Sequence, residues 1–304
     1  MQIINVPQGS QEWHEERRKG IGGSDAAAIL GLSKWNTPLT LWMEKTGAAT
    51  EQERTQEQAR GNFLENGILE WYQWHTQQKV ERINGIIRSE EHPFMQFSPD
   101  GIADDRIVVE VKTALVDDEW GDEGTDQIPT EYMIQVQHEM AVVKFNVAHV
   151  PVLFPHFHFS LYIVHADPEL QELIRAAEQE WWENHVLTNV MPEPTTHGDV
   201  VKKYGQAKVG PIEATPEIVE MVTELKEVKA RLKLTEQEKE EAEAQIKNFM
   251  GVHDTLMYQG NRLATWNNTK ARESFDRERF ARAHPSLSKE FTKIGQPGRT
   301  FLLK

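Results

Sequence analysis

Asp100, Glu110 and Lys112 are the residues of this chain whose types and spacing best suit chemistry. Asp100 ends one expected strand, a turn follows at Gly101, and the next expected strand, 107–112, is mostly apolar. Side chains alternate between the two faces of a strand, so Glu110 and Lys112 project from the same side. Burying two carboxylates and an ammonium group is costly unless they bind something. A divalent cation shared by the carboxylates would offset that cost, which is the pattern of a metal-dependent phosphodiesterase site.

Hydrolysis of a phosphodiester requires an activated water, a positioned phosphate and a stabilised leaving oxygen, and two Mg²⁺ ions supply all three in many nucleases. Mg²⁺ prefers oxygen ligands and keeps several of its waters. In this interpretation Asp100 bridges the two ions. Glu110 and the carbonyl of Val111 are further ligands of one ion, and Glu65 is a further ligand of the other. Lys112 orients the attacking water. The alternative is a surface hairpin in which Glu110 and Lys112 form an ion pair and Glu65 is solvated.

Composition narrows the class of protein. The chain has 304 residues, no cysteine and a net charge of -15. Disulfides, zinc–thiolate sites and cysteine nucleophiles are therefore excluded, and the absence of a signal peptide or membrane-length apolar stretch predicts a soluble cytoplasmic protein. The acidic excess belongs to residues 1–210, with 17 Lys and Arg against 33 Asp and Glu, whereas residues 251–304 carry 10 against 5. A polyanionic partner would be attracted chiefly by the C-terminal segment.

The expected elements place the acidic residues at the edge of a sheet. We expect helices at 10–20, 25–30, 37–46, 50–77, 131–143 and 169–186, and strands at 80–88, 95–98, 107–112, 148–154 and 156–164. This order predicts an α/β (α+β) fold with a mixed central β-sheet flanked by helices. The acidic segment 117–129 is predicted as a loop, in which Trp120 either reaches DNA or packs as a lid.

The C-terminal third differs in composition from the rest. We expect a nuclease core at 1–190, a Pro/Gly-rich linker at 191–214, a long helix or coiled coil at 215–250 and a basic α/β segment at 251–304. Heptad positions starting at Ile218 and Met221 are apolar except near Thr235 and Lys239. A hairpin with its turn at Gly260-Asn261 and a basic helix at 276–284 are predicted beyond it.

Two further sites are weighed from the residues alone. The turn Gly22-Gly23-Ser24, with Ser24 or Asp25 as a helix cap, exposes N–H groups that suit an anion, but local sequence favours an ordinary connector between helices. His156 and His158 share a face of an expected strand, and structural roles are favoured over zinc binding. No nucleophile elbow, P-loop or dinucleotide fingerprint is present.

Five separate blocks resemble, in order, the YqaJ-type viral recombinase family, the lambda-type alkaline exonucleases of the PD-(D/E)xK nuclease fold. The blocks span 10 to about 164, roughly half the chain, and are Trp13-x-x-x-Arg17 with Gly20-Ile21-Gly22-Gly23-Ser24-Asp25, Arg60-Gly61 with Glu65, Ser98-Pro99-Asp100-Gly101, Glu110-Val111-Lys112, and Tyr132-Met133-x-Gln135-Val136-Gln137. The resemblance implies metal ligands and a catalytic lysine at the positions derived above. It also implies that Gln135, with Tyr132 nearby, supports the centre from the next helix.

The same resemblance implies a polarity of digestion. Arg17 and Ser24, with Ser98, would form a pocket for a 5′-terminal phosphate, which overturns the connector interpretation of the turn. The implied activity is a Mg²⁺-dependent exonuclease, with Mn²⁺ as a second candidate, that digests duplex DNA from a free 5′ end. It would leave 3′ overhangs for a single-strand annealing protein in phage-type recombination, within a bacterial or phage-infected cell, and would form a trimer.

Alternatives remain open at this point. An endonuclease could use the same two-metal centre without recognising an end, and a non-catalytic DNA-binding or assembly protein could keep the fold. The C-terminal helix and basic tail depart from the shortest lambda-type members. They could hold DNA electrostatically, mediate assembly, or simply pack on the core.

Overall fold

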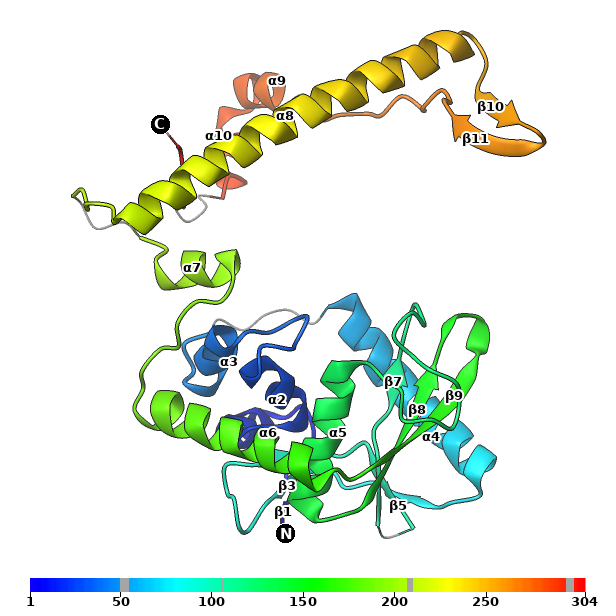
Figure 1. The fold of residues 1–304 in the computed structure, drawn as a ribbon, viewed down its shortest axis with the longest axis vertical. Helices are drawn as coiled ribbons and strands as arrows, with labels where there is room; N and C mark the ends of the chain where they lie inside the picture. The colour runs from blue at the N-terminus through cyan, green and yellow to red at the C-terminus, as the bar shows by residue number, and fades with distance from the viewer. Residues whose placement is uncertain (50–54, 105, 207–209, 294–297, 304) are drawn as a thin grey trace. The chain divides into compact units, whose positions relative to one another are not determined.

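A computed structural model describes residues 1–49, 55–104, 106–206, 210–293 and 298–303. The chain divides into two compact units, Met1–Lys203 and Tyr204–Lys304, which are described separately. The first unit (Figure 1) contains, in chain order, β1 (Gln2–Ile4), α1 (Gln11–Arg18), α2 (Gly23–Ile29), α3 (Pro38–Lys45), α4 (Gln56–Thr76), β2 (Val80–Glu81), β3 (Ile86–Arg88), β4 (Gln96–Phe97), β5 (Gly101–Ala103), β6 (Ile107–Val109), β7 (Lys112–Thr113), α5 (Thr130–Val143), β8 (Val147–Leu153), the 3₁₀ turn η1 (Pro155–Phe157), β9 (Phe159–His165), α6 (Pro168–Trp181), the π-helical η2 (Trp182–Leu187) and α7 (His197–Lys203).

A six-stranded mixed sheet forms the centre of this unit, so the predicted fold class is confirmed. Its strand order is β2-β5-β6-β8-β7, with β9 antiparallel on β8. Both β6 and β7 run parallel to β8. They follow one another along the same edge of β8, since Val109 pairs with His149 and Lys112 with Val152 at the same offset.

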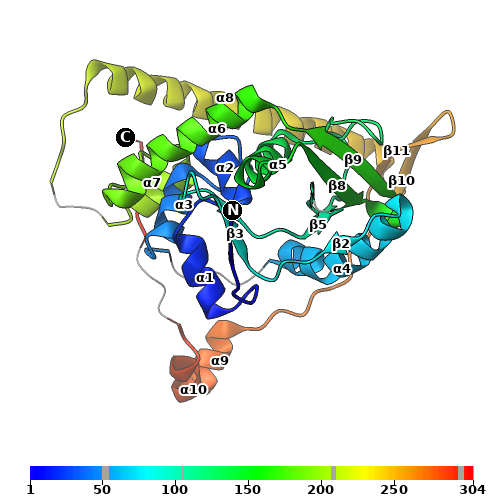
Figure 2. The same cartoon turned by 90° about the horizontal axis from the view of Figure 1, so that it is seen from below.

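Helices α5 and α4 cover opposite faces of the sheet (Figure 2). Val108 packs in the same buried cluster as Val136 and Met140 of α5, whereas the next residue, Val109, packs with Ile68 of α4. The alternation of side chains along a strand produces this division. The sheet is therefore buried on both faces, and its strand ends are where polar groups can gather.

The expected strand 107–112 is interrupted after Val109, and a proline on the facing strand gives the reason. Main-chain nitrogens of Glu110 and Ala114 donate to the carbonyls of His149 and Leu153 at 3.0 and 3.2 Å. In a regular parallel ladder the N–H of residue 151 would donate back to the carbonyl of Glu110. Residue 151 is a proline and has no N–H. The Glu110 carbonyl loses that ladder bond, so Glu110 and Val111 lie between β6 and β7.

Other expected boundaries need correction. The segment 80–88 is not one strand, because β2 pairs with β5 and β3 pairs with β1 and β4 of a separate three-stranded sheet. Gly101 lies within β5 rather than in a turn. A Cβ there would stand 2.3 Å from Val80 Cγ1, so the close approach of β2 requires glycine. The chain turns later, at Asp104, whose φ is 42°.

The helix starts agree with their capping residues except at α2. Ser10 caps α1 and Thr37 caps α3 through their side chains, and both helices start close to the expected positions. Helix α2 begins earlier than expected, with Gly22 as its N-cap, so Ser24 and Asp25 lie within its first turn. His156 precedes β9 in the turn η1, so the predicted strand at 156–164 begins too early. Residues 50–54, at the expected start of α4, lie outside the described residues.

The first part of the expected linker, 191–214, is a structured element of the first unit. It contains α7, and Asp199 of α7 is only 1% exposed. The Asp199 carboxylate accepts hydrogen bonds from Thr37 Oγ1 at 2.8 Å and from the main-chain nitrogens of Thr195 and Thr196, each at 3.1 Å. One buried aspartate thus ties α7 to the cap of α3.

The second unit contains the long helix α8 (Pro216–Met250), the hairpin β10 (Thr255–Tyr258) and β11 (Asn261–Thr265), and two short helices, α9 (Arg277–Ala283) and α10 (Pro285–Glu290). Thr215 caps α8. The hairpin turns at Gln259 and Gly260, whose φ values are 48° and 85°, one residue earlier than expected. The apolar heptad residues of α8, such as Ile218 and Met221, are exposed, at 47% and 61%.

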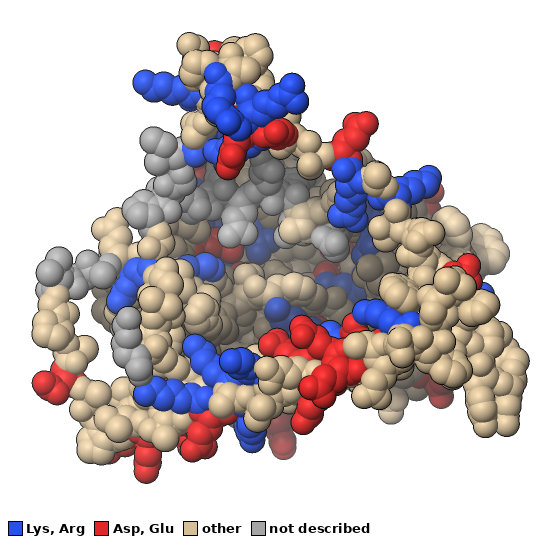
Figure 3. Space-filling model, turned by 90° about the horizontal axis from the view of Figure 1, so that it is seen from above, with Lys and Arg blue, Asp and Glu red and all other residues tan. Residues whose placement is uncertain are grey.

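Charged side chains of both signs lie side by side on the face drawn in Figure 3.

Among the described residues, no helix has the length and apolar character needed to cross a bilayer.

Candidate active site

Glu110, Lys112 and Gln135 form a closed hydrogen-bonded triangle where β6 gives way to β7. Lys112 Nζ donates to Glu110 Oε1 at 2.8 Å and to Gln135 Oε1 at 2.9 Å. Gln135 Nε2, from α5, donates to the same Glu110 oxygen at 2.6 Å. Glu110 is only 6% exposed, so both contacts act in a low-dielectric setting where charge-assisted hydrogen bonds are strong. The surface ion pair considered above does not describe this arrangement.

Asp100 lies beside this triangle, immediately before β5. Its Oδ2 accepts a hydrogen bond from the main-chain nitrogen of Val111 at 2.8 Å. Burial and the negative charges of Glu110 and Glu65 raise the pKa of Asp100 well above its usual range. The carboxylates therefore repel one another in a site that holds them close together.

Glu65 reaches the same cavity from α4. A cavity of about 190 Å³ is lined by Gln8, Gly61, Asn62, Glu65, Asp100, Glu110, Val111, Lys112 and Thr113. The Glu65 carboxylate accepts a hydrogen bond from Arg82, but burial and the Glu110 charge outweigh that partner and raise its pKa. Within the described ranges no three His, Asp or Glu side chains are gathered closely enough to hold a metal ion.

The residues nevertheless fit a hard divalent cation by their chemistry. Three carboxylates line one cavity, and their mutual repulsion is what a positive ion would relieve. The N–H of Val111 points to Asp100, and in an extended chain the carbonyl of the same residue points to the same side. That carbonyl would be a fourth oxygen donor to such an ion. The Arg82 contact of Glu65 involves its Oε1.

Lys112 is held as an ammonium group. Burial disfavours its charge, but Glu110 and Asp100 outweigh this effect and raise its pKa. Its Nζ also lies 4.5 Å from the centre of the Tyr132 ring, a cation–π contact. Tyr132 and Gln135 come from the same face of α5, which the three-residue spacing predicts.

Arg17, Ser24 and Ser98 gather around Trp13 of α1. The Trp13 indole Nε1 donates to Ser98 Oγ at 3.0 Å, and the Arg17 guanidinium lies 5.0 Å from the centre of the Trp13 ring. Arg17 Nη2 lies 3.5 Å from both Ser24 Oγ and Asp25 Oδ1. The three residues expected to bind a phosphate are thus brought together from three separate segments.

A match to a family model and to a curated relative decides the family. The model described as YqaJ-like viral recombinase domain matches residues 12–146. A Bacillus subtilis (strain 168) protein, YqaJ, described as uncharacterised, is 32% identical over 273 residues, which cover 86% of this chain and 84% of the relative. This chain belongs to the YqaJ-like viral recombinase family.

Solved structures with the same fold include an alkaline exonuclease. LHK-Exo of Laribacter hongkongensis gives a TM-score of 0.50 at 18% identity. The alignment covers 60% of this YqaJ-family chain and 94% of the LHK-Exo chain. LHK-Exo in complex with dAMP gives a TM-score of 0.50 at 17% identity over the same shares. The structural likeness shows the fold, and the predicted resemblance to the YqaJ family is confirmed.

Glu139 adjoins the triangle of Glu110, Lys112 and Gln135, and the sequence analysis missed it. It is 2% exposed, and its Oε1 accepts a hydrogen bond from Gln135 Nε2 at 2.9 Å. Its Oε2 is buried without a hydrogen-bond partner in the described part of the chain. Burial and the Glu110 charge raise its pKa well above the usual range, so a neutral carboxyl fits the site. Its position four residues after Gln135, on the same helix face, is the signal that would have found it.

Two buried polar pairs were also missed. Asp25 is held by Lys45 Nζ at 2.6 Å, and both side chains are almost completely buried. His138 Nδ1 lies 2.7 Å from Glu178 Oε1, and its Nε2 lies 3.0 Å from the Gln96 carbonyl. The first pair fixes α2 beside Arg17, and the second fixes α5 to α6.

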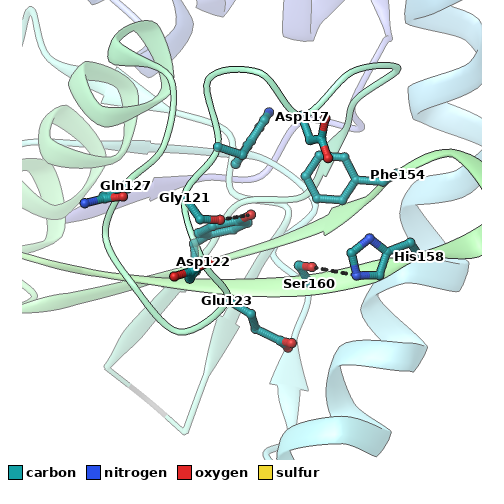
Figure 4. A pocket seen from close by; sticks show the side chains of 10 residues that line it. Asp117, Gly121, Asp122, Glu123, Gln127, Phe154, His158 and Ser160 are labelled. Carbon is teal, nitrogen blue, oxygen red and sulfur yellow. Dashed lines mark hydrogen bonds between the residues drawn. The ribbon is translucent and has the colours of Figure 1, made fainter.

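A second, larger cavity lies outside this centre (Figure 4). It measures about 440 Å³, with Asp117, Asp122 and Glu123 around the rings of Phe154, Trp120 and Tyr162. Acidic walls do not suit a polyanion. Trp120 packs at 5.0 Å from the Tyr162 ring and 5.7 Å from the Tyr132 ring, so of the two roles considered for it, packing describes this structure.

Proposed function

We propose that this protein is a metal-dependent deoxyribonuclease that digests duplex DNA from a free 5′ end and leaves 3′ overhangs for recombination. The observation that carries the proposal is the convergence of Glu110, Lys112 and Gln135 in one buried triangle beside Asp100. Membership of the YqaJ-like viral recombinase family and the fold of the alkaline exonuclease LHK-Exo support a nuclease.

The ligands proposed for Mg²⁺, or Mn²⁺ in its place, are Glu65, Asp100, Glu110 and the carbonyl of Val111. When bound, two such ions polarise the scissile phosphate and lower the pKa of a bound water. The residues themselves supply position and charge. Lys112 places its ammonium group where it meets the phosphate charge and the attacking water. Gln135 fixes the lysine and Glu110 relative to each other through one amide group.

The proposed polarity depends on the group around Trp13. A guanidinium at Arg17 and hydroxyls at Ser24 and Ser98 are suitable donors for the oxygens of a terminal phosphate. Asp25 neutralises part of the Arg17 charge, so a dianionic 5′-phosphate must compete with it. A terminal phosphate bound here would place one particular phosphodiester bond, at a fixed distance from the 5′ end, next to the carboxylates.

The decisive experiment compares linear and closed circular duplex DNA, each labelled, with Mg²⁺ or with EDTA. We expect linear DNA to be degraded only with the metal, and 5′-phosphorylated ends to be preferred over 5′-hydroxyl ends. Cutting of closed circles would instead establish an endonuclease, and equal digestion of both kinds of end would remove the phosphate pocket. No cutting of either DNA with Mg²⁺ or Mn²⁺ would leave a non-catalytic DNA-binding role.

A further inference from the structure

Tyr132 and Trp35 form a stack that begins beside the proposed catalytic lysine and ends in an exposed ring. Lys112 Nζ lies 4.5 Å from the centre of the Tyr132 ring, and the Trp35 ring lies 6.2 Å from Tyr132 at an interplanar angle of 26°. Trp120 contacts Tyr132 at 5.7 Å. Trp120 is partly buried and packs against the core cluster, whereas Trp35 is 66% exposed. The outermost ring thus offers a largely free aromatic surface next to the active centre.

The segment that carries Trp35 is held in place on both sides. The Ser33 hydroxyl accepts hydrogen bonds from the main-chain nitrogens of Trp35 and Asn36 at 3.2 and 3.1 Å. Lys34 forms ion pairs with Glu119 and, at 3.1 Å, with Glu131. An exposed tryptophan on a segment fixed in this way needs little ordering when something binds to it.

Burial does not account for a tryptophan in this position. A side chain that stays two-thirds exposed gains little from folding, because the hydrophobic contribution scales with the apolar area removed from water. The one basic residue of the segment is already engaged, since Lys34 pairs with both Glu119 and Glu131 and its single charge offsets only one of the two carboxylates. The segment 33–36 therefore presents an exposed aromatic side chain, and its one cation is held in ion pairs rather than free to contact a phosphate.

We propose that Trp35 is a stacking site for an unpaired nucleobase at the end of the DNA, an inference that rests on the proposed nuclease function. Every base has a π-face, so stacking on tryptophan is strong and independent of sequence. Lys112 contacts the Tyr132 ring, and Tyr132 contacts the Trp35 ring. A base stacked on Trp35 would therefore lie near the ammonium group that is proposed to meet the phosphate. Trp35 holds the separated terminal nucleotide while the phosphate lies in the carboxylate cavity.

The test measures binding without cleavage, in EDTA, by fluorescence anisotropy of labelled 5′-phosphorylated duplexes. One duplex is fully paired, a second has mismatched terminal bases, and a third has abasic residues in their place. For Trp35→Ala we expect about 5- to 150-fold weaker binding of the mismatched duplex, and for Trp35→Phe a smaller loss. The abasic duplex should bind both Trp35→Ala and the wild type equally weakly.

Trp74→Ala is the matched control, because Trp74 is similarly exposed, at 71%, but lies in α4 away from this stack. It should bind all three duplexes like the wild type. Unchanged binding of the mismatched duplex by Trp35→Ala would overturn the inference, as would an equal loss for the abasic duplex. These outcomes are separate from failure of the proposed function, which would appear as a wild-type protein that degrades no DNA with Mg²⁺ or Mn²⁺.

Discussion

At the scale of single residues, the centre is built on one carboxylate oxygen. Glu110 Oε1 accepts hydrogen bonds from both Lys112 and Gln135, and Gln135 in turn accepts from the same lysine. Removal of any member leaves buried polar atoms without partners, so the three side chains act as a unit. Their effects on activity should therefore be strongly non-additive.

Lys112→Ala and Asp100→Ala should each lower the rate of DNA hydrolysis by at least about 100-fold, because each removes a preorganised charge at the reacting phosphate. The rate is measured as release of acid-soluble label from linear duplex with Mg²⁺. Lys79→Ala, at an exposed lysine, is the control and should match the wild type. Wild-type rates in both active-centre variants would refute the catalytic assignment.

Glu139 predicts a pH dependence of stability. Its pKa is raised in the folded protein, so the folded state binds more protons than the unfolded state once the pH exceeds the usual value for glutamate, about 4.3. The free energy of unfolding should therefore fall as the pH rises above the usual pKa of glutamate and through the raised pKa of the folded state. For the Glu139→Gln variant the free energy of unfolding, measured by urea titration at each pH, should fall less steeply, since the glutamine side chain does not ionise. Parallel pH profiles for the two proteins would contradict a neutral Glu139.

The sequence identified those site residues whose chemistry has a local signature. Asp100, Glu110 and Lys112 were found because acids and a lysine interrupt an apolar strand. Glu139 and the Asp25–Lys45 pair could not be found this way, since their burial depends on which helices pack together. The Arg82 contact of Glu65 was equally inaccessible, because it joins α4 to the chain beyond β2. The roles proposed for these residues remain predictions.

At the scale of elements, Gly23 of α2 packs directly against the Glu139 side chain of α5, so a larger residue there would displace that side chain. A Cβ on Gly23 would lie 2.5 Å from Glu139 Oε1 and 2.9 Å from its Cγ. Gly23 precedes Ser24 of the proposed phosphate pocket, while Glu139 follows Gln135 on α5. This contact therefore sets the separation between the pocket and the carboxylate centre.

Gly23→Ala should lower the free energy of unfolding by about 1–3 kcal/mol, because the added methyl group forces α2 and α5 apart. It should also reduce the preference for 5′-phosphorylated ends, since Ser24 moves with α2. Combination with Glu139→Ala should recover part of the stability in a double-mutant cycle. Gly67→Ala is the control, because nothing lies within 4 Å of a Cβ at that helical glycine. Additive losses in the cycle would show that the two residues do not oppose each other.

Most elements were predicted in type and order, and the errors arose from long-range pairing. The segment 80–88 has the composition of one strand, but its ends pair with different sheets. The break between β6 and β7 depends on Pro151, which neighbours them only after β8 has been added. The capped helices, such as α1 and α3, were placed well because capping is local.

At the scale of the whole molecule, the two comparisons differ in how much of the chain they cover. LHK-Exo covers 60% of this chain, whereas YqaJ of Bacillus subtilis aligns with 86%. The first unit ends at Lys203, so the YqaJ alignment includes part of the second unit. Part of the second unit is therefore shared with YqaJ.

Replacement of Arg277, Arg279 and Arg282 by glutamine tests whether α9 contacts DNA. If it does, DNA affinity should fall, and the slope of log affinity against log salt should become shallower by up to about 3. Both are measured by anisotropy in EDTA. Replacement of Lys226, Lys229 and Lys233 of α8 removes the same charge and serves as the control. Identical slopes for both variants and the wild type would exclude α9 as a DNA contact.

The exposed apolar positions of α8 test assembly. Leu225 and Leu232 are 36% and 58% exposed and occupy the same heptad position. If α8 joins copies of the chain, as a proposed trimer would allow, Leu225→Glu with Leu232→Glu should lower the molar mass measured by light scattering. Lys226→Glu with Lys233→Glu, outside the a and d positions, is the control. A mass that stays the same in both variants would remove α8 from the assembly.

The contact between Gly23 and Glu139 also constrains which sequences this family can use. A Cβ at position 23 would take space that the Glu139 side chain now occupies between α2 and α5, and a shorter side chain at position 139 would relieve that contact. The two positions should therefore covary among related chains, although they are distant in sequence. Chains that keep a long side chain at 139 should show only glycine at 23.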